Sequence, residues 1–152
     1  MSGDPISHTT GFALPVDIHH IFPRAWCRKK KVSDQKCNSI VNKAPLTSPT
    51  NRKLGGNAPS EYLDRLVRDG AITSSRLEDV LKSHWIEPHI LRTDAFDVFL
   101  RDRAIQLLEA IEAAMGRPVQ GRSSEEVISE FGGPLVCGES MDRLAGPSES
   151  VD

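Results

Sequence analysis

The sequence has few aromatic residues, few cysteines and no long apolar run, and these shortages limit the classes of protein that it can belong to. Aromatic residues are only 5% of the 152 residues, so we expect a modest hydrophobic core. Three cysteines without a Cys-x-x-Cys spacing do not indicate a disulfide framework. No apolar run approaches the length of a membrane span, and the N-terminus lacks a signal-peptide core. These shortages predict a protein of the reducing cytoplasm with no membrane partner.

Acidic side chains are almost absent from one segment, although the whole chain has a formal net charge of -2. Between Arg24 and Lys53 the single acid is Asp34, against nine lysines and arginines. Such an asymmetry is typical of a surface that binds a polyanion. A solvated loop is the alternative interpretation of the run Arg28–Lys31. The candidate nucleic-acid contacts are Arg24, Arg28, Lys29, Lys30, Lys31, Arg52 and Lys53.

The stretch Val16–Pro23 contains one aspartate and two histidines within four residues. Apolar positions 16, 18 and 21 alternate at first with polar ones, which predicts a short half-buried strand that ends at the proline. On a strand, Asp17 and His19 share one face, and His20 starts from the opposite one. Two imidazoles and a carboxylate are costly to bury without partners. They suit a metal site with a general base beside it.

A second strand and a short helix are expected downstream. In chain order the sequence predicts a basic loop over Arg24–Lys31, a turn over Asn38–Asn42 with Ile40 and Val41 facing inward, and an edge strand over Ala44–Thr47. Ser48 and Pro49 are a helix-start signal, and this helix carries Asn51 and stops at Gly55 and Gly56. The predicted order is strand, basic loop, strand and helix.

The second half of the chain is predicted to be helical. The expected helices open at Ser60, at a Ser75–Glu78 capping box, at Thr93 and at Ser123. The third is the longest and ends at Gly116, and the fourth ends at Phe131. Residues 132–152 are rich in glycine, proline, serine and acids, and we expect them to be disordered.

Two groups of residues carry a resemblance to a known family. Asp17–Pro23, followed by Asn42 and then Asn51, resembles the HNH nuclease motif with its ββα-metal fold. The wider run from Val16 to Leu63, and the helical extension after it, looks like the C-terminal nuclease region of GmrSD-type restriction endonucleases. The resemblance implies an α+β fold with an HNH ββα-metal module over 12–57 and a helical extension over 58–117. Outside these, the sequence itself predicts a flexible arm over 1–11 and a short helix with a disordered tail over 118–152.

The resemblance also implies a role for each matching residue. His19 would bind a single divalent metal ion and His20 would be the general base. Asn42 would brace the hairpin loop and help to orient His20, and Asn51 would be the second protein ligand. Asp17 would be a ligand or a supporting acid. Histidine stands where many members have aspartate, so preference moves from magnesium toward zinc, nickel or manganese, because imidazole is the softer donor.

The predicted activity is metal-dependent hydrolysis of DNA phosphodiester bonds, in a nuclease domain or fragment of a restriction or defence system. A nucleotide-dependent targeting domain or subunit, absent from this chain, is the implied partner. One alternative is a non-catalytic nucleic-acid-binding module, in which the histidines share a structural zinc with Cys27 or Cys37. Another is a nuclease fold without activity that serves as an interaction domain. Replacement of His20 separates these hypotheses.

Overall fold

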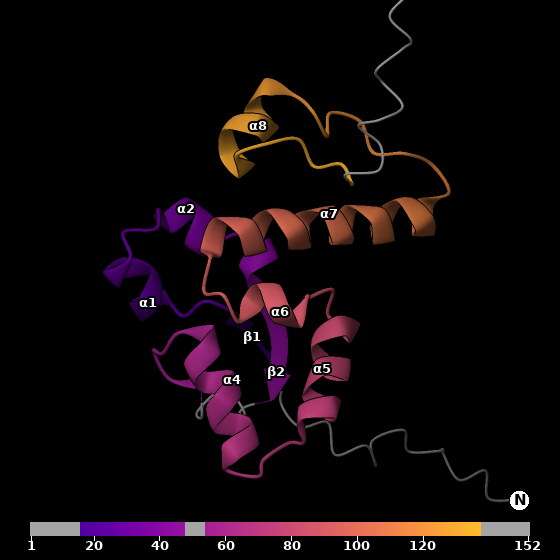
Figure 1. The fold of residues 1–152 in the computed structure, drawn as a ribbon. Coiled ribbons are helices and arrows are strands. Elements are labelled where there is room, and N and C mark those ends of the chain that lie inside the picture. Colours follow the sequence, from indigo (N-terminus) through magenta and orange to yellow (C-terminus); the bar gives the residue numbers. More distant parts are fainter. Residues whose placement is uncertain (1–15, 48–53, 138–152) are drawn as a thin grey trace, which may run out of the picture. The chain divides into compact units, whose positions relative to one another are not determined.

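The computed structural model describes residues 16–47 and 54–137, which combine helices with a small two-stranded sheet (Figure 1). This mixed, mostly helical content confirms the predicted combination of helices and strands. The chain divides into two compact units between Tyr62 and Leu63. The predicted arm, the start of the helix at Ser48 and the tail beyond residue 137 lie outside the described residues.

The sheet of the first unit consists of β1 (Val16–His20) and β2 (Lys43–Thr47), which pair antiparallel. Both lie where strands were predicted, but β1 ends at His20 rather than at Pro23, and β2 begins one residue earlier than expected. In the register His19 pairs with Ala44 and His20 with Lys43. The half-buried pattern fails at Ile18, which is 61% exposed. A ribbon with two strands in the described chain offers little cover for this side chain.

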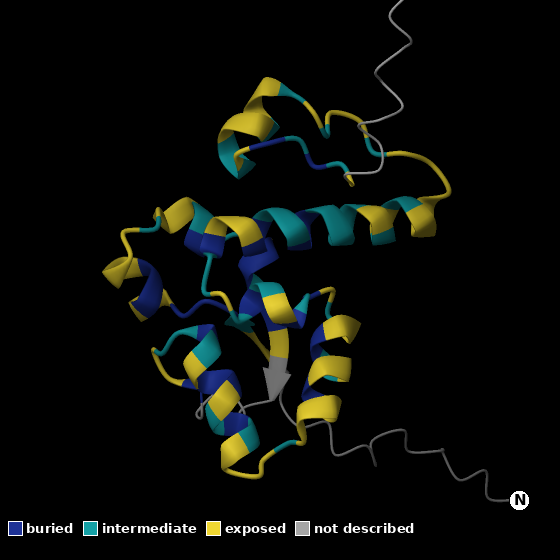
Figure 2. Cartoon of the chain, in the orientation of Figure 1, coloured by how far each residue is buried: buried dark blue, intermediate teal, exposed yellow. Residues whose placement is uncertain are grey.

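Three short helices connect the strands: α1 (Arg24–Lys29), α2 (Asp34–Cys37) and the 3₁₀ helix η2 (Ile40–Asn42). The expected basic loop is therefore wrong over α1. Arginine and lysine are good helix formers, and Trp26 and Cys27 give this helix a buried side (Figure 2). Ile40 is 72% exposed, although Val41 is buried as expected. One turn of 3₁₀ helix directs these neighbouring side chains to different sides.

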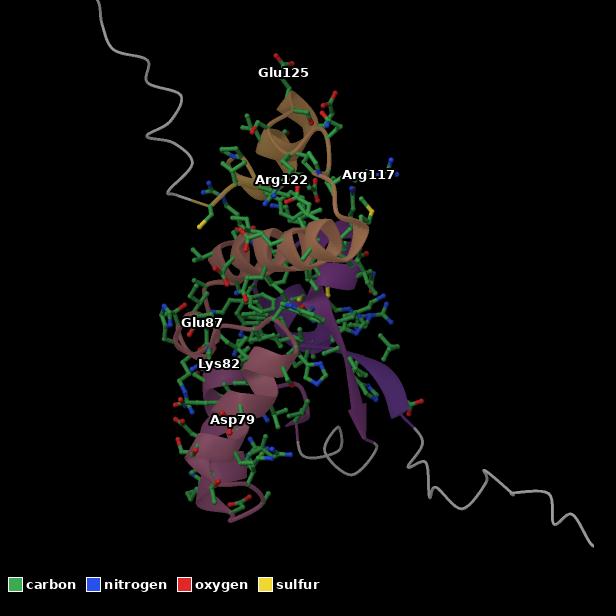
Figure 3. The ribbon with its side chains drawn as sticks, turned by 90° about the vertical axis from the view of Figure 1, so that its right-hand side faces the viewer. Asp79, Lys82, Glu87, Arg117, Arg122 and Glu125 are labelled. Atoms are coloured by element: carbon green, nitrogen blue, oxygen red, sulfur yellow. The ribbon has the colours of Figure 1, made fainter. Side chains whose placement is uncertain are left out.

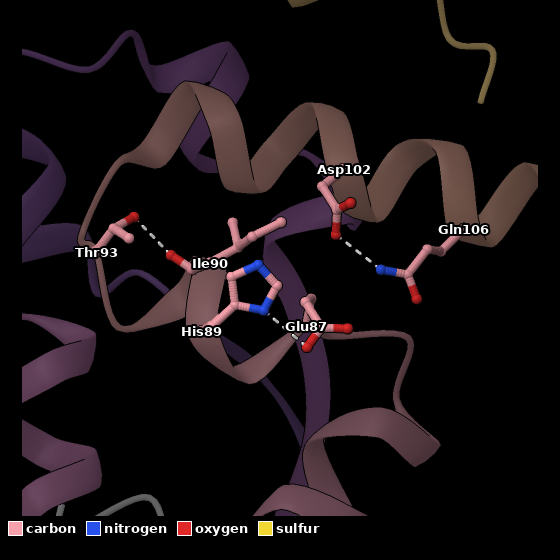
Figure 4. Close-up of polar contacts among 6 residues, drawn as sticks. All are labelled: Glu87, His89, Ile90, Thr93, Asp102 and Gln106. Carbon is pink, nitrogen blue, oxygen red and sulfur yellow. Dashed lines mark hydrogen bonds and ion pairs between the residues drawn. The ribbon is translucent and has the colours of Figure 1, made fainter. Parts of the chain in front are cut away.

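From residue 59 to residue 137 the structure describes α4 (Pro59–Arg68), α5 (Ser74–Ser83), α6 (Pro88–Leu91), α7 (Phe96–Met115) and α8 (Glu125–Phe131). All except α6 were predicted, but several starts differ. Thr73 rather than Ser75 caps α5, since its hydroxyl accepts from the Arg76 amide. Thr93 does not begin α7: its hydroxyl donates to the Ile90 carbonyl at 2.7 Å (Figure 4).

The core of the second unit includes the first half of α7. Phe96, Phe99, Leu100 and Ala104 are buried, as their helical spacing predicts, whereas the last turns of α7 are exposed (Figure 2). Arg103 is buried with them, and burial lowers the pKa of its guanidinium to about 10. Its Nε donates to the His84 carbonyl at 3.2 Å, which satisfies part of the buried charge.

The first part of the expected disordered tail packs within the second unit. Leu135 is buried, and its amide donates to the Arg122 carbonyl at 2.8 Å. The Arg122 guanidinium in turn lies between α7 and the segment that carries α8 (Figure 3), where Nη1 donates to Glu112 Oε2 at 2.9 Å. Hydrogen bonds from Val119 and Arg122 hold the pKa of the Glu112 carboxyl below its usual value. Amino-acid composition does not reveal these contacts, and they order a segment for which composition predicts disorder.

Candidate functional site

The strand β1 places Asp17 and His19 together, as strand periodicity predicts. The Oδ2 atom of Asp17 lies 3.8 Å from Nε2 of His19. This Nε2 atom is buried and makes no hydrogen bond with any residue that the structure describes. A buried ring nitrogen without a partner is costly, and a lone pair beside a carboxylate suits a divalent cation. The arrangement therefore fits the predicted metal ligand at His19.

The rest of the predicted ligand set is not placed. Asn51, the proposed second ligand, lies outside the described residues, as do Arg52 and Lys53. Among the residues that the structure does describe, no three histidine, cysteine, aspartate or glutamate side chains gather as a metal-binding group. The ligand set of His19, Asp17 and Asn51 remains a prediction.

The imidazole of His20 makes a different contact from that of its neighbour. Its Nε2 atom lies 3.0 Å from Oδ1 of Asn38, the residue that follows α2. The sequence pattern predicted a turn at Asn38 but no role for its side chain in the site. Two adjacent histidines therefore have distinct surroundings: among the described residues, the buried Nε2 of His19 has no hydrogen bond, whereas His20 is held by an asparagine oxygen. This difference is what a division of labour between them requires.

Asn42 is fully buried and braces the chain just after the histidines. Its Oδ1 accepts from the Phe22 amide at 2.9 Å. Its Nδ2 donates to the carbonyls of Phe22 and Cys37, at 3.1 and 2.9 Å. Within the described chain its side-chain hydrogen bonds go to Phe22 and Cys37 rather than to His20, and burial keeps it from a substrate. We therefore assign Asn42 a positioning role, through the backbone that follows β1.

Tyr62 completes the hydrogen bonding of the backbone at Ile21 and Phe22, directly after β1. Its buried hydroxyl donates to the Ile21 carbonyl at 2.9 Å, while the Ile21 amide donates to the Asn42 carbonyl at 2.8 Å. Every backbone amide and carbonyl of Ile21 and Phe22 is thus paired. Buried peptide groups that are fully paired make a rigid support. This is the only tyrosine of the chain, and its position in a helix of the extension gave no signal of this contact.

The predicted cations of the basic segment are exposed. Arg24, Arg28, Lys29, Lys30 and Lys31 all lie on α1 or directly after it, with exposed side chains. Trp26 anchors this helix from the buried side, with its ring centroid 4.7 Å from that of Phe22. The positive charges are therefore carried on a packed element within the same unit as the histidines.

The two cysteines of the zinc alternative are buried free thiols. Burial and the adjacent Cys37 raise the pKa of Cys27 to about 12. The Cys27 thiol donates to the Phe22 carbonyl, with sulfur and oxygen 3.6 Å apart. Because metals bind the thiolate, a protonated thiol in this setting behaves as a small apolar group.

The histidines of the second unit make local contacts. His89 is exposed, and its Nδ1 lies 3.0 Å from Oε1 of Glu87 (Figure 4). An exposed pair of this kind contributes little stability. The backbone of His84 accepts from Arg103, as described above.

Comparisons with known proteins identify one relative. The chain is 31% identical over 80 residues to the uncharacterized protein MJ0686 of Methanocaldococcus jannaschii. The match covers 47% of this chain but only 13% of the archaeal protein. No family model matches the chain, and no solved structure matches it. Within the described residues, no helix combines the length and apolarity that crossing a bilayer requires.

Proposed function

We propose that this chain is a metal-dependent endonuclease that hydrolyses DNA phosphodiester bonds through an HNH module of the ββα-metal type. The observation that supports it best is the contrast between adjacent imidazoles on β1. His19 has a buried Nε2 atom beside Asp17 with no hydrogen bond in the described chain, and His20 is held by Asn38. A nuclease of this type needs one histidine to bind a cation and another to take a proton.

The ligands proposed for the cation are His19, Asp17 and Asn51. When bound, the ion would neutralise charge on the phosphoryl and leaving oxygens. Imidazole ligation favours zinc, nickel or manganese over magnesium.

The protein itself supplies the general base and the positive charges that bind the nucleic acid. His20 accepts a proton from the attacking water, a contribution of roughly 10²- to 10⁴-fold in rate. The exposed cations of α1 hold the phosphate backbone and read no bases. Affinity that arises from such contacts falls steeply as salt rises, because bound phosphates release counterions.

We further propose a place for this activity in restriction or defence. The resemblance of the run from Val16 to Leu63 to GmrSD-type nucleases supports a nuclease module that works with other domains. We propose a nucleotide-dependent targeting domain or subunit as the partner.

A plasmid cleavage assay tests the proposal. Supercoiled DNA is incubated with the protein and magnesium, manganese, nickel or zinc, and EDTA is added to matched samples. We expect nicked and linear products with at least one metal and none with EDTA. The matched control is a His19→Ala/His20→Ala double variant. Equal nicking by the two proteins under every metal, or no cleavage with any metal, would overturn the proposal.

At Lys31, one substitution is expected to change DNA binding and the stability of the first unit in opposite directions. It has φ +59 directly after α1, where its amide donates to Arg28 and the Val32 amide donates to Cys27. Glycine is favoured in this helix-ending conformation. Lys31→Gly should therefore stabilise the first unit by about 0.5–1 kcal/mol. At the same time it should weaken DNA binding and reduce the salt slope by about one.

Urea denaturation and DNA binding at several salt concentrations measure the two effects. Lys31→Arg is the control, because it keeps the charge and the strained backbone, and its DNA affinity should stay near that of the wild type. Unchanged DNA affinity in Lys31→Gly would remove this residue from the proposed contact surface.

A further inference from the structure

We infer that Asn38 is a positioning residue that holds neutral His20 with its hydrogen on Nε2, so that Nδ1 is the atom that receives the proton. This inference rests on the proposed function, and it names the reacting atom of the base. It begins from the 3.0 Å contact between His20 Nε2 and Asn38 Oδ1.

The chemistry of the two side chains sets the direction of this hydrogen bond. With Oδ1 of Asn38 facing the ring, Nε2 carries the hydrogen, because an amide oxygen can only accept. A neutral imidazole with a hydrogen on Nε2 has its lone pair on Nδ1. Among the residues that the structure describes, no hydrogen bond to Nδ1 of His20 is found. That nitrogen is therefore available to a water molecule.

Both ends of this contact are attached to a braced backbone. The amide of Asn38 donates to the Asp34 carbonyl at 2.9 Å, and the preceding Cys37 carbonyl accepts from the buried Asn42 side chain. On the other side, the residues after His20 are held by Asn42 and Tyr62. The same buried asparagine thus ties together the segments that carry the imidazole and its partner. A general base needs this kind of fixed geometry.

The opposite arrangement makes an opposite prediction. If the Asn38 amide were turned over, its Nδ2 would donate to an unprotonated Nε2, and the hydrogen would sit on Nδ1. The tautomer of His20 therefore decides between the two arrangements. It can be measured without metal or DNA, so it does not depend on activity.

Nitrogen-15 NMR of the whole chain provides this measurement. A long-range proton–nitrogen correlation spectrum distinguishes protonated from unprotonated ring nitrogens, and the His20→Ala spectrum assigns the His20 signals. At a pH where the ring is neutral, we expect Nε2 protonated and Nδ1 unprotonated in the wild type. Asn38→Ala should shift part of the population to the other tautomer, and Asn38→Asp, which retains an acceptor, should restore it. A wild type protonated on Nδ1, or an unchanged Asn38→Ala spectrum, would overturn the inference.

Steady-state cleavage kinetics, with DNA in excess over the protein, provide the second measurement. Asn38→Ala should lower kcat by roughly three- to tenfold, the range that corresponds to the net contribution of one hydrogen bond, and should leave KM unchanged. Asn38→Asp should recover most of the loss. Gln35→Ala, at an exposed position of α2, is the matched control and should cleave like the wild type. A fall in Asn38→Ala that appears in KM alone would instead indicate a contact with DNA, and would also overturn the inference.

The two arms separate this inference from the proposed function. If the wild type cleaves DNA, and Asn38→Ala changes neither kcat nor the His20 tautomer, the proposed nuclease function stands and the positioning role of Asn38 is rejected. If the wild type does not cleave DNA, the proposed nuclease function is rejected. The NMR measurement still decides whether Asn38 holds the imidazole of His20.

Discussion

Alanine in place of His20 is expected to lower the rate of DNA cleavage by roughly 10²- to 10⁴-fold, because the attacking water loses its general base. Fold and metal content should not change. The proposed ligands are His19, Asp17 and Asn51, and the contacts that brace the end of β1 involve the backbone of Ile21 and Phe22 rather than the imidazole of His20.

Cleavage, metal content and stability should be measured on the same preparations. His19→Ala is the paired variant, and it should lose metal affinity together with activity. If His20→Ala loses its metal and unfolds at lower temperature, the histidines are structural ligands and the zinc-stabilised, non-catalytic module is the better description. If His20→Ala retains metal and still cleaves at the wild-type rate, the division of labour between the two imidazoles is wrong.

Asn42→Ala should destabilise the first unit by about 3 kcal/mol or more, because it leaves buried polar groups without partners. The amide and carbonyl of Phe22 and the carbonyl of Cys37 all bond to this one side chain, and the Phe22 carbonyl keeps only the weak Cys27 thiol as a further donor. Each unpaired buried group costs about 1–3 kcal/mol. Cleavage should fall as well, since the backbone beyond β1 loses its support.

Tryptophan fluorescence can follow the first unit alone. The chain has two tryptophans, of which Trp26 is buried in the first unit and Trp85 is exposed in the second. In a Trp85→Phe background, urea denaturation monitored through Trp26 reports on the unit that contains Asn42. Asn38→Ala is the matched control, because this asparagine is exposed, and it should change stability by less than about 0.5 kcal/mol. A loss below about 1 kcal/mol in Asn42→Ala would mean that water replaces its hydrogen bonds.

Local patterns located most of the regular elements. Alternating polarity around Asp17 and His19, with Pro23 after them, was enough to place β1 and to put these two side chains on one face. Helical spacing likewise placed α7 and the buried residues of its first half. These features depend on interactions between residues a few positions apart, and short-range propensity and periodicity encode them directly.

The caps and the basic helix show where local patterns were ambiguous. Thr73 and Ser75 are both acceptable caps, and which one begins α5 depends on how the helix packs. The run after Pro23 resembled a solvated loop because its charges dominate. Burial of Trp26 and Cys27 made it a helix instead.

The contacts that define the candidate site join residues far apart in the sequence. Asn38 is 18 positions from His20, and Tyr62 is 41 positions from Ile21. No local sequence preference identifies such partners, because the tertiary fold decides which distant side chains come into contact. Residue types and strand periodicity were therefore sufficient to nominate two histidines. Their different surroundings in the described part of the chain, a buried nitrogen without a hydrogen bond on one and an asparagine oxygen on the other, arose from tertiary packing.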